Sequence, residues 1–128
     1  MTKVPDDRRY TKEHEWAREQ DGRIVIGITD FAQDQLGDVV FVGLPESGAA
    51  VEAGKPLGEV ESTKSVSDVY SPVSGTVIEK NSEVETNPEL INADPYDKGW
   101  LVAIDAEAAV LDGLMSAAEY QTLIGEQG

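Results

Sequence analysis

The sequence predicts a mainly β domain, arranged as a sandwich or barrel of two similar halves. Glycine and proline interrupt short β-prone runs about every eight to twelve residues, a spacing typical of these two architectures. The pattern Val-Glu-x-(Gly/Asn)-x-x-Leu also occurs twice, at 51–57 and at 84–90. Because Gly and Asn most readily adopt positive φ, we expect the two copies to share a backbone shape, one in each half.

The composition is that of one acidic domain. The 128 residues are enough to bury roughly two-thirds of the unfolded surface without a disulfide or a metal. The chain has no cysteine, which excludes disulfides, iron–sulfur clusters and thiolate sites. Its 10 basic and 25 acidic residues give a net charge of −15, which repels phosphate backbones. We therefore expect no nucleic-acid partner, and protein partners with positive patches.

Residues 1–9 are expected to form a loose leader, followed by a single domain over 10–128. The leader contains no apolar core of a signal peptide, and its acidic residues argue against an organellar transit peptide. No apolar run approaches the length of a membrane span. These features predict a soluble, cytoplasmic protein without membrane contact, which we expect to be a monomer in isolation.

The first elements are predicted from turn and capping signals. Asp21-Gly22 is a tight-turn pair between two β-prone runs. A short helix is expected over 31–36, because Asp30 can cap it and Gln33 completes a capping box. Gly37 then provides the left-handed residue at which such a helix ends. The strands are predicted from short apolar runs between these signals, at 23–28, 38–42, 57–61, 66–70, 76–80 and 100–104.

A second helix is predicted near the C-terminus, over 117–124. The segment Ser116-Ala117-Ala118-Glu119 is a capping box, and Met115 and Tyr120 stand at the spacing of a hydrophobic staple. Gly125 is expected to end this helix.

Lys64 is the candidate functional residue. It lies between the predicted strands 57–61 and 66–70, among Ser, Thr and Asp residues that suit a turn because their side chains bond local backbone groups. This pattern places Lys64 at a hairpin tip, where it is either a solvated charge or a lysine presented for modification. Lys55, in a Gly-x-Pro turn, is the rival acceptor.

Spaced motifs follow one another along the chain from Tyr10 to about Tyr120. They are Tyr10-Thr11-x-Glu13-His14-Glu15-Trp16, Gly27-Ile28-Thr29-Asp30-x-Ala32-Gln33, Leu36-Gly37-Asp38-Val39-Val40-Phe41-Val42, Leu44-Pro45, Glu61-Ser62-Thr63-Lys64-Ser65-x-Ser67-Asp68, Ser71-Pro72-Val73-Ser74-Gly75, Asn87-Pro88-Glu89-Leu90-Ile91-Asn92, Asp94-Pro95-Tyr96 and Gly99-Trp100. Together they resemble the H proteins of the glycine cleavage system. That resemblance implies the lipoyl-domain-like fold, a barrel-sandwich hybrid in which two quasi-symmetric halves form a flattened β-barrel.

The resemblance also implies a cofactor and a set of partners. Lys64 would carry lipoate in amide linkage, as N6-lipoyllysine, on a carrier that catalyses no step itself. It would take the aminomethyl group of glycine from the PLP-dependent glycine decarboxylase to the tetrahydrofolate-dependent aminomethyltransferase. Dihydrolipoyl dehydrogenase would reoxidise the arm, and a lipoyl-transferring or ligating enzyme would attach it. Lys55 lacks the Glu-Ser-x-Lys context, so the arm is expected on Lys64.

Other site residues are expected around this lysine. A loaded arm carries an aminomethyl thioether that hydrolyses in water, so we expect the arm to fold into a protecting cleft. Its amine is cationic, so we expect it to meet carboxylates there. The resemblance points to Glu15 and Asp68 as this pair, and Glu61 is expected to be a recognition charge. The family often has Val and Ala around its lysine, where this chain has Thr63 and Ser65, and these two are expected to shape the bend.

The remaining candidates are expected to be structural. His14 has no nucleophile or metal-ligand set beside it in the sequence, so we interpret it as structural, with no catalytic residue and no metal site predicted. Trp16 and Trp100 are interpreted as core or edge anchors.

Three alternatives remain open. A lipoyl module of a 2-oxoacid dehydrogenase is typically shorter and lacks the Glu-His-Glu-Trp segment. A biotin carrier would have methionines beside its lysine, whereas the methionines here are Met1 and Met115. A specialised paralogue, acting as an interaction protein or as a lipoyl donor to other complexes, fits the same motifs.

Overall fold

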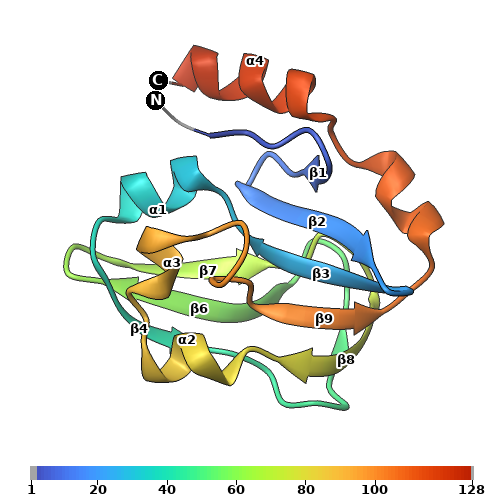
Figure 1. The fold of residues 1–128 in the computed structure, drawn as a ribbon, viewed down its shortest axis with the longest axis horizontal. Coiled ribbons are helices and arrows are strands. Elements are labelled where there is room, and N and C mark those ends of the chain that lie inside the picture. The colour runs from blue at the N-terminus through green and yellow to red at the C-terminus, as the bar shows by residue number, and fades with distance from the viewer. Residues whose placement is uncertain (1–2, 128) are drawn as a thin grey trace.

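Two antiparallel sheets enclose the core in the computed structural model, which describes residues 3–127 (Figure 1). One sheet has six strands in the order β1-β2-β3-β9-β8-β5, and the other has three in the order β4-β6-β7. The strands are β1 Arg9–Tyr10, β2 Glu15–Gln20, β3 Arg23–Ile28, β4 Val39–Gly43, β5 Ala50–Val51, β6 Pro56–Ser62, β7 Val66–Tyr70, β8 Gly75–Lys80 and β9 Val102–Asp105. The helices are α1 Asp30–Leu36, α2 Ser82–Thr86, α3 Leu90–Ala93, α4 Ala117–Gln127 and the 3-10 helix η1 Ala108–Gly113.

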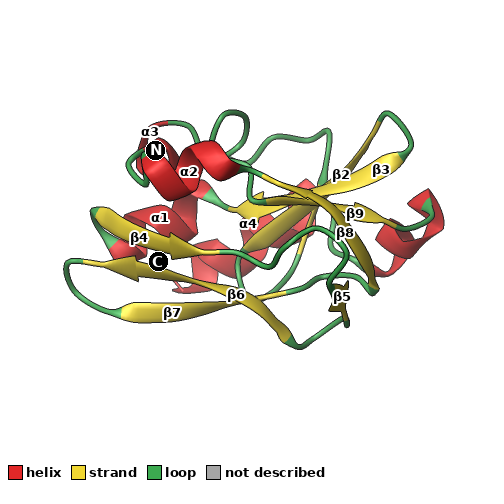
Figure 2. Ribbon diagram, turned by 90° about the horizontal axis from the view of Figure 1, so that it is seen from below, coloured by secondary structure: helices red, strands yellow, loops and turns green. Residues whose placement is uncertain are grey.

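The core lies between the two sheets, which occupy separate layers in Figure 2. Ile26 of β3 and Ile104 of β9 belong to the same buried cluster as Val60 of β6 and Val69 of β7. Alternation along β6 sends Val60 inward and the neighbouring Glu59 and Glu61 outward. The fold class is therefore confirmed as mainly β, and among residues 3–127 the sheets do not close into a barrel.

The repeated seven-residue pattern does not mark equivalent backbone. The first copy is a turn that leads from β5 into β6, with Gly54 at φ 84°. The second copy covers the end of α2 and the start of α3, where Asn87 has φ −126°. The expectation of a shared positive φ was wrong, because Asn87 is the C-terminal cap of a short helix.

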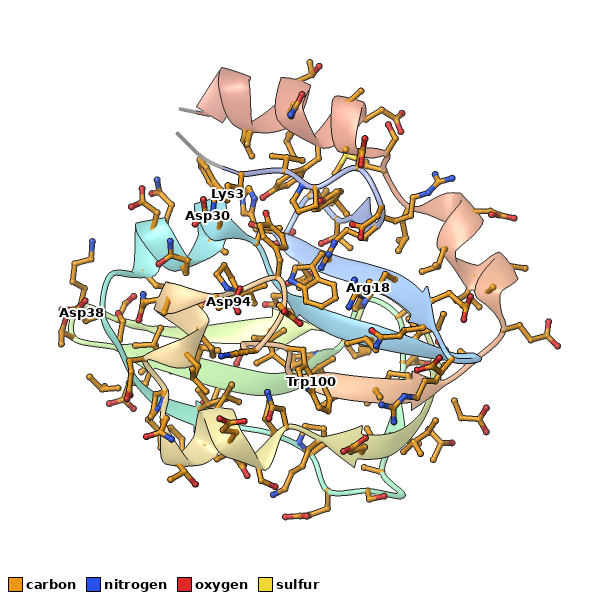
Figure 3. The ribbon with its side chains drawn as sticks, viewed as in Figure 1. Lys3, Arg18, Asp30, Asp38, Asp94 and Trp100 are labelled. Carbon is orange, nitrogen blue, oxygen red and sulfur yellow. The ribbon has the colours of Figure 1, made fainter. Side chains whose placement is uncertain are left out.

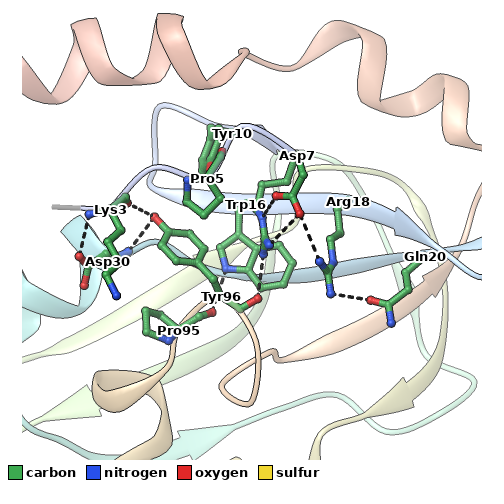
Figure 4. A network of polar contacts seen from close by, with 11 residues as sticks. Lys3, Pro5, Asp7, Tyr10, Trp16, Arg18, Gln20, Asp30, Pro95 and Tyr96 are labelled. Atoms are coloured by element: carbon green, nitrogen blue, oxygen red, sulfur yellow. Dashed lines mark hydrogen bonds and ion pairs between the residues drawn. The ribbon is translucent and has the colours of Figure 1, made fainter.

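Residues 3–9 differ from the loose leader that we expected. Arg8 is 9 % exposed, and its guanidinium lies 4.6 Å from the centre of the Trp16 ring. The same group donates a 2.8 Å hydrogen bond to the carbonyl of Tyr96. The backbone N–H of Lys3 donates to the carboxylate of Asp30 at 2.9 Å (Figure 4). This segment is held because a cation over aromatic rings is stabilised by their negative faces.

The end of α1 agrees with the prediction, whereas its start is shifted. The capping hydroxyl belongs to Thr29, which accepts the N–H of Ala32 at 3.1 Å, so the helix begins at Asp30 itself. The Asp30 carboxylate accepts instead from the side chain of Gln33, at 2.8 Å. Gly37 has φ 81° and ends the helix as expected.

The start of the C-terminal helix agrees with the prediction, whereas its end lies further along the chain than predicted. The N–H of Ser116 donates to the Glu119 carboxylate at 2.9 Å, and the N–H of Glu119 donates to the Ser116 hydroxyl at 3.2 Å, which confirms the capping box. The predicted stop at Gly125 was wrong, because α4 continues to Gln127. No helix within residues 3–127 is long and apolar enough to cross a membrane.

The predicted strands are all present; 23–28 and 66–70 agree at both ends, and the other four differ by one or two residues at one or both ends. Asp21 and Gly22 both have positive φ, which confirms the tight turn between β2 and β3. The short helices α2, α3 and η1 were not predicted. Trp16 is fully buried, whereas Trp100 is half-buried at the edge of the aromatic cluster; its place beside β9 is visible in Figure 3.

Candidate functional site

Lys64 lies at the tip of the hairpin between β6 and β7, and its side chain is exposed. The two strands pair up to Glu61 and Val66, and the turn is closed by the N–H of Ser62, which donates to the carbonyl of Ser65 at 2.8 Å. The Lys64 stem crosses Gly37, where a Cβ atom would lie only 3.1 Å from the lysine Cε. The absence of a side chain at Gly37 therefore leaves room for the stem.

The bend itself is organised by Ser62, which sequence reasoning did not single out. Its buried hydroxyl oxygen accepts the N–H groups of Lys64 and of Ser65, both at 3.1 Å. Thr63 contributes its backbone N–H, which donates to the carbonyl of Asp38 at 3.1 Å. Figure 3 shows Asp38 at the same end of the molecule as this turn. The sequence did contain a signal for this role of Ser62, because a serine at the start of a polar bend commonly bonds the backbone N–H groups that follow it.

A cleft of about 450 Å³ opens beside the hairpin. Its walls come from β7, from α1 and from the turn at 13–15. Ser65, the residue after Lys64, is one of its lining residues. The apolar lining is Ile28, Phe31, Ala32, Leu36, Val60, Val66 and Val69. The polar lining is Glu13, His14, Glu15, Gln35, Ser65, Ser67 and Asp68. Such a cleft suits an apolar chain that ends in a polar or cationic group.

Glu15 is the buried carboxyl of this cleft, at 2 % exposure. The Thr11 hydroxyl donates to one of its oxygens at 2.6 Å, and the N–H of Tyr70 donates to the other at 3.3 Å. Burial raises the pKa of Glu15 to about 7, because a carboxylate loses its hydration there; the two hydrogen bonds oppose this, and the nearby charge of Glu13 adds to it. At neutral pH the group therefore exists in both protonation states.

Asp68 and Glu61 have more exposed positions. Asp68 stands opposite Glu59 on the neighbouring strand and lines the cleft. It also borders a second, open hollow of about 600 Å³ that contains Phe41 and Glu59. The structure thus brings Glu15 and Asp68 to one cleft. Glu61 lies outside the cleft lining, and it pairs with Phe41 of β4 and Val66 of β7.

His14 and Lys55 can now be placed. The His14 ring lies 4.7 Å from the Phe31 ring, and its Nδ1 is 2.8 Å from the Tyr120 hydroxyl. Lys55 directly precedes the first residue of β6, whereas Lys64 comes two residues after the last one, so the two lysines lie at opposite ends of that strand. A seven-residue strand spans roughly 20 Å, which separates Lys55 from the turn at Lys64.

Comparison with known proteins gives one consistent result. The family model described as "Glycine cleavage H-protein" matches residues 8–127. A glycine cleavage system H protein of Halalkalibacterium halodurans is 48 % identical over 128 residues, covering 99 % of this chain and 100 % of the relative. One of Coprothermobacter proteolyticus is 52 % identical over 126 residues, covering 97 % and 99 %. The crystal structure of a glycine cleavage system H protein from Mycobacterium marinum superposes with a TM-score of 0.89 at 44 % identity, covering 95 % of this chain and 99 % of that one.

Proposed function

Because this chain belongs to the glycine cleavage H-protein family, we propose that lipoate is attached to Lys64 and that this arm carries the aminomethyl group of glycine. The role of lipoyl carrier in glycine cleavage follows from that membership, and a 2-oxoacid dehydrogenase module is not favoured. The observation that best supports Lys64 is its exposed position at a hairpin tip directly beside the cleft.

The residues around Lys64 fit such an arm. The lysine stem is unbranched, its amine is accessible for acylation, and the bend beneath it is held by the Ser62 hydroxyl. When attached, lipoate supplies the sulfur that binds the cargo and the disulfide that is reduced and re-formed. A tether of this kind raises the local concentration of the cargo at each partner, since the cargo stays attached to the hairpin with which the partner docks.

The cleft supports a resting place for the loaded arm. Its apolar wall, which includes Phe31 and Leu36, would cover the hydrocarbon part and exclude water from a cargo that hydrolyses readily. The carboxylate of Glu15 would accept charge-assisted hydrogen bonds from the cationic amine. Asp68, which is exposed but lines the same cleft, would be the second acidic contact.

The proposed partners are the enzymes that handle this arm. They are glycine decarboxylase, aminomethyltransferase, dihydrolipoyl dehydrogenase and the enzyme that attaches lipoate. The net charge of −15 supports docking surfaces on these enzymes that are locally basic. Glu61, three residues before Lys64 and exposed, is the proposed recognition charge for attachment.

We assign no catalytic step to this chain. His14 has a positioning role through its contacts with Phe31 and Tyr120.

The test is the intact mass of the protein from a lipoate-competent host. The wild type should gain the mass of one lipoyl group, Lys64→Arg should gain none, and the matched control Lys55→Arg should gain the same as wild type. No gain in the wild type would refute lipoylation, and gain in Lys64→Arg would move the attachment point. Glycine-dependent exchange of carbon dioxide with the decarboxylase then distinguishes a glycine carrier from a lipoyl donor.

A further inference from the structure

The C-terminal helix α4 reaches the cleft region through one buried side chain, Tyr120. Its hydroxyl lies 2.8 Å from Nδ1 of His14 and 2.7 Å from the hydroxyl of Thr29. These two partners lie at different walls of the cleft: His14 lines it from the 11–15 turn, and Thr29 caps α1, which forms the apolar wall. The sequence separations of 106 and 91 residues show that both contacts depend on docking of α4.

The turn that carries His14 needs such support. His14 has φ 72°, a left-handed conformation that a residue with a Cβ seldom adopts. Its N–H donates to the carbonyl of Thr11 at 3.1 Å, and its carbonyl accepts the N–H of Thr29 at 3.0 Å. Glu13 and Glu15 flank His14 and line the cleft, so the conformation of His14 decides where these carboxylates point.

The opposite wall depends on Thr29. Its hydroxyl oxygen accepts the N–H of Ala32 at 3.1 Å and so caps α1, which contributes Phe31, Ala32 and Leu36 to the apolar lining. The His14 ring also lies 4.7 Å from the Phe31 ring, so the two walls touch where Tyr120 joins them.

We propose that Tyr120 is a positioning residue of the cleft, whose hydroxyl ties the 11–15 turn to the start of α1 and thereby holds Glu15 facing the apolar wall. The inference rests on the proposed function only in taking this cleft as the resting place of the arm. Burial raises the pKa of Tyr120, so its hydroxyl stays protonated and able to donate at physiological pH. Through this contact α4 stabilises the walls of the cleft, although Tyr120 is not among the cleft-lining residues.

Tyr10 provides the matched control. Its ring is fully buried and stacks on the Tyr120 ring, with centroids 4.7 Å apart and planes at 8°. Its hydroxyl donates to the carbonyl of Pro5, outside the cleft lining. Tyr120→Phe and Tyr10→Phe therefore remove the same atom from the same aromatic stack, and only the first removes a link between the cleft walls.

The experiment compares backbone amide exchange in the unlipoylated, full-length variants. In Tyr120→Phe, the N–H groups of Glu15 and Thr29 should exchange about tenfold faster, the factor expected for the loss of one buried hydrogen bond. In Tyr10→Phe they should stay at the wild-type rate once global stability is matched. Thr29→Ser keeps the hydroxyl and should also behave as wild type. Equal exchange in the two Tyr→Phe variants would overturn the proposal.

A second readout uses the lipoylated protein loaded with its cargo. Hydrolysis of the cargo should be several-fold faster in Tyr120→Phe and unchanged in Tyr10→Phe. Equal hydrolysis rates in both variants would overturn the positioning role. Because the exchange measurement needs no lipoate, it decides the role of Tyr120 even if the mass test were to refute lipoylation of Lys64.

Discussion

The Ser62 hydroxyl oxygen accepts the backbone N–H of Lys64 at 3.1 Å. It accepts the N–H of Ser65 at the same distance, so one buried side chain satisfies the backbone on both sides of the hairpin tip. The lysine proposed to carry lipoate is thus exposed on a bend whose backbone is fixed by a buried hydroxyl group. The exposed lysine and the buried serine act together, although only the lysine is conspicuous in the sequence.

Ser62→Ala should destabilise the protein by about 1 to 2 kcal/mol, because two N–H groups lose their acceptor in a buried turn. It should also slow lipoylation, since the bend becomes mobile. Denaturant unfolding and a time course of the added mass measure the two effects. Ser67→Ala removes an exposed hydroxyl from β7 and should change neither by much. Similar losses in both variants would argue against a special role for Ser62.

Glu15→Gln should change how stability depends on pH. The pKa of Glu15 is raised from 4.5 to about 7, so between these values the folded state binds a proton that the unfolded state has released. Stability contributed by this group is complete below about pH 4.5 and is lost as pH rises through 7. A shift of this size corresponds to about 3 kcal/mol. Glu15→Gln should therefore gain stability relative to wild type between pH 5 and pH 8.

Unfolding curves at a series of pH values test this difference. Glu13→Gln is the matched comparison, because Glu13 is exposed on the same turn and its charge is the smallest of the contributions to the pKa of Glu15. This variant should lower the pKa of Glu15 only slightly and so keep most of the wild-type pH dependence of stability. Parallel stability profiles for Glu15→Gln and the wild type would contradict a raised pKa at Glu15.

Neutralising the two cleft carboxylates should shorten the lifetime of the loaded arm. The double variant Glu15→Gln/Asp68→Asn removes both acceptors of the proposed charge-assisted hydrogen bonds, so we expect hydrolysis about tenfold faster. In the wild type, hydrolysis should also accelerate as the pH falls below 7, where Glu15 gains its proton. The rate of cargo release from loaded protein measures both effects. Glu59→Gln, outside the cleft lining, should release cargo at the wild-type rate; an unchanged rate in the double variant would exclude the carboxylate contacts.

Two glycine substitutions should have opposite effects on stability. Gly37→Ala should cost about 1 kcal/mol or more, because Gly37 has φ 81° and a new Cβ would crowd the Lys64 stem at 3.1 Å. Gly125→Ala lies within α4 in open space and should be neutral or stabilise by up to about 1 kcal/mol. Thermal unfolding of both variants makes the comparison, and a loss of stability in Gly125→Ala would contradict its helical placement.

Several elements could be predicted because their signals are local. The hairpin at 57–70 follows from two β-prone runs around a polar bend, and the capping box at 116–119 follows from adjacent side chains and backbone. The errors arose where distant residues intervene. Arg8, within the segment expected to be loose, lies over the rings of Trp16 and Tyr96. The cap of α1 is Thr29, one residue before the Asp30 that we expected.

The sequence by itself determined the fold class, the hairpin that presents Lys64 and the family motifs, because these depend on alternation, turn residues and spacing along one strand or turn. The tertiary structure alone decided that Glu15 is buried and has a raised pKa, since burial depends on what packs over it and Tyr70 lies 55 residues away. It also decided that Tyr120 joins His14 to Thr29 across separations of 106 and 91 residues. Contacts of this kind form only when the whole chain folds. They build the cleft beside the Lys64 hairpin and place the acidic side chains in it.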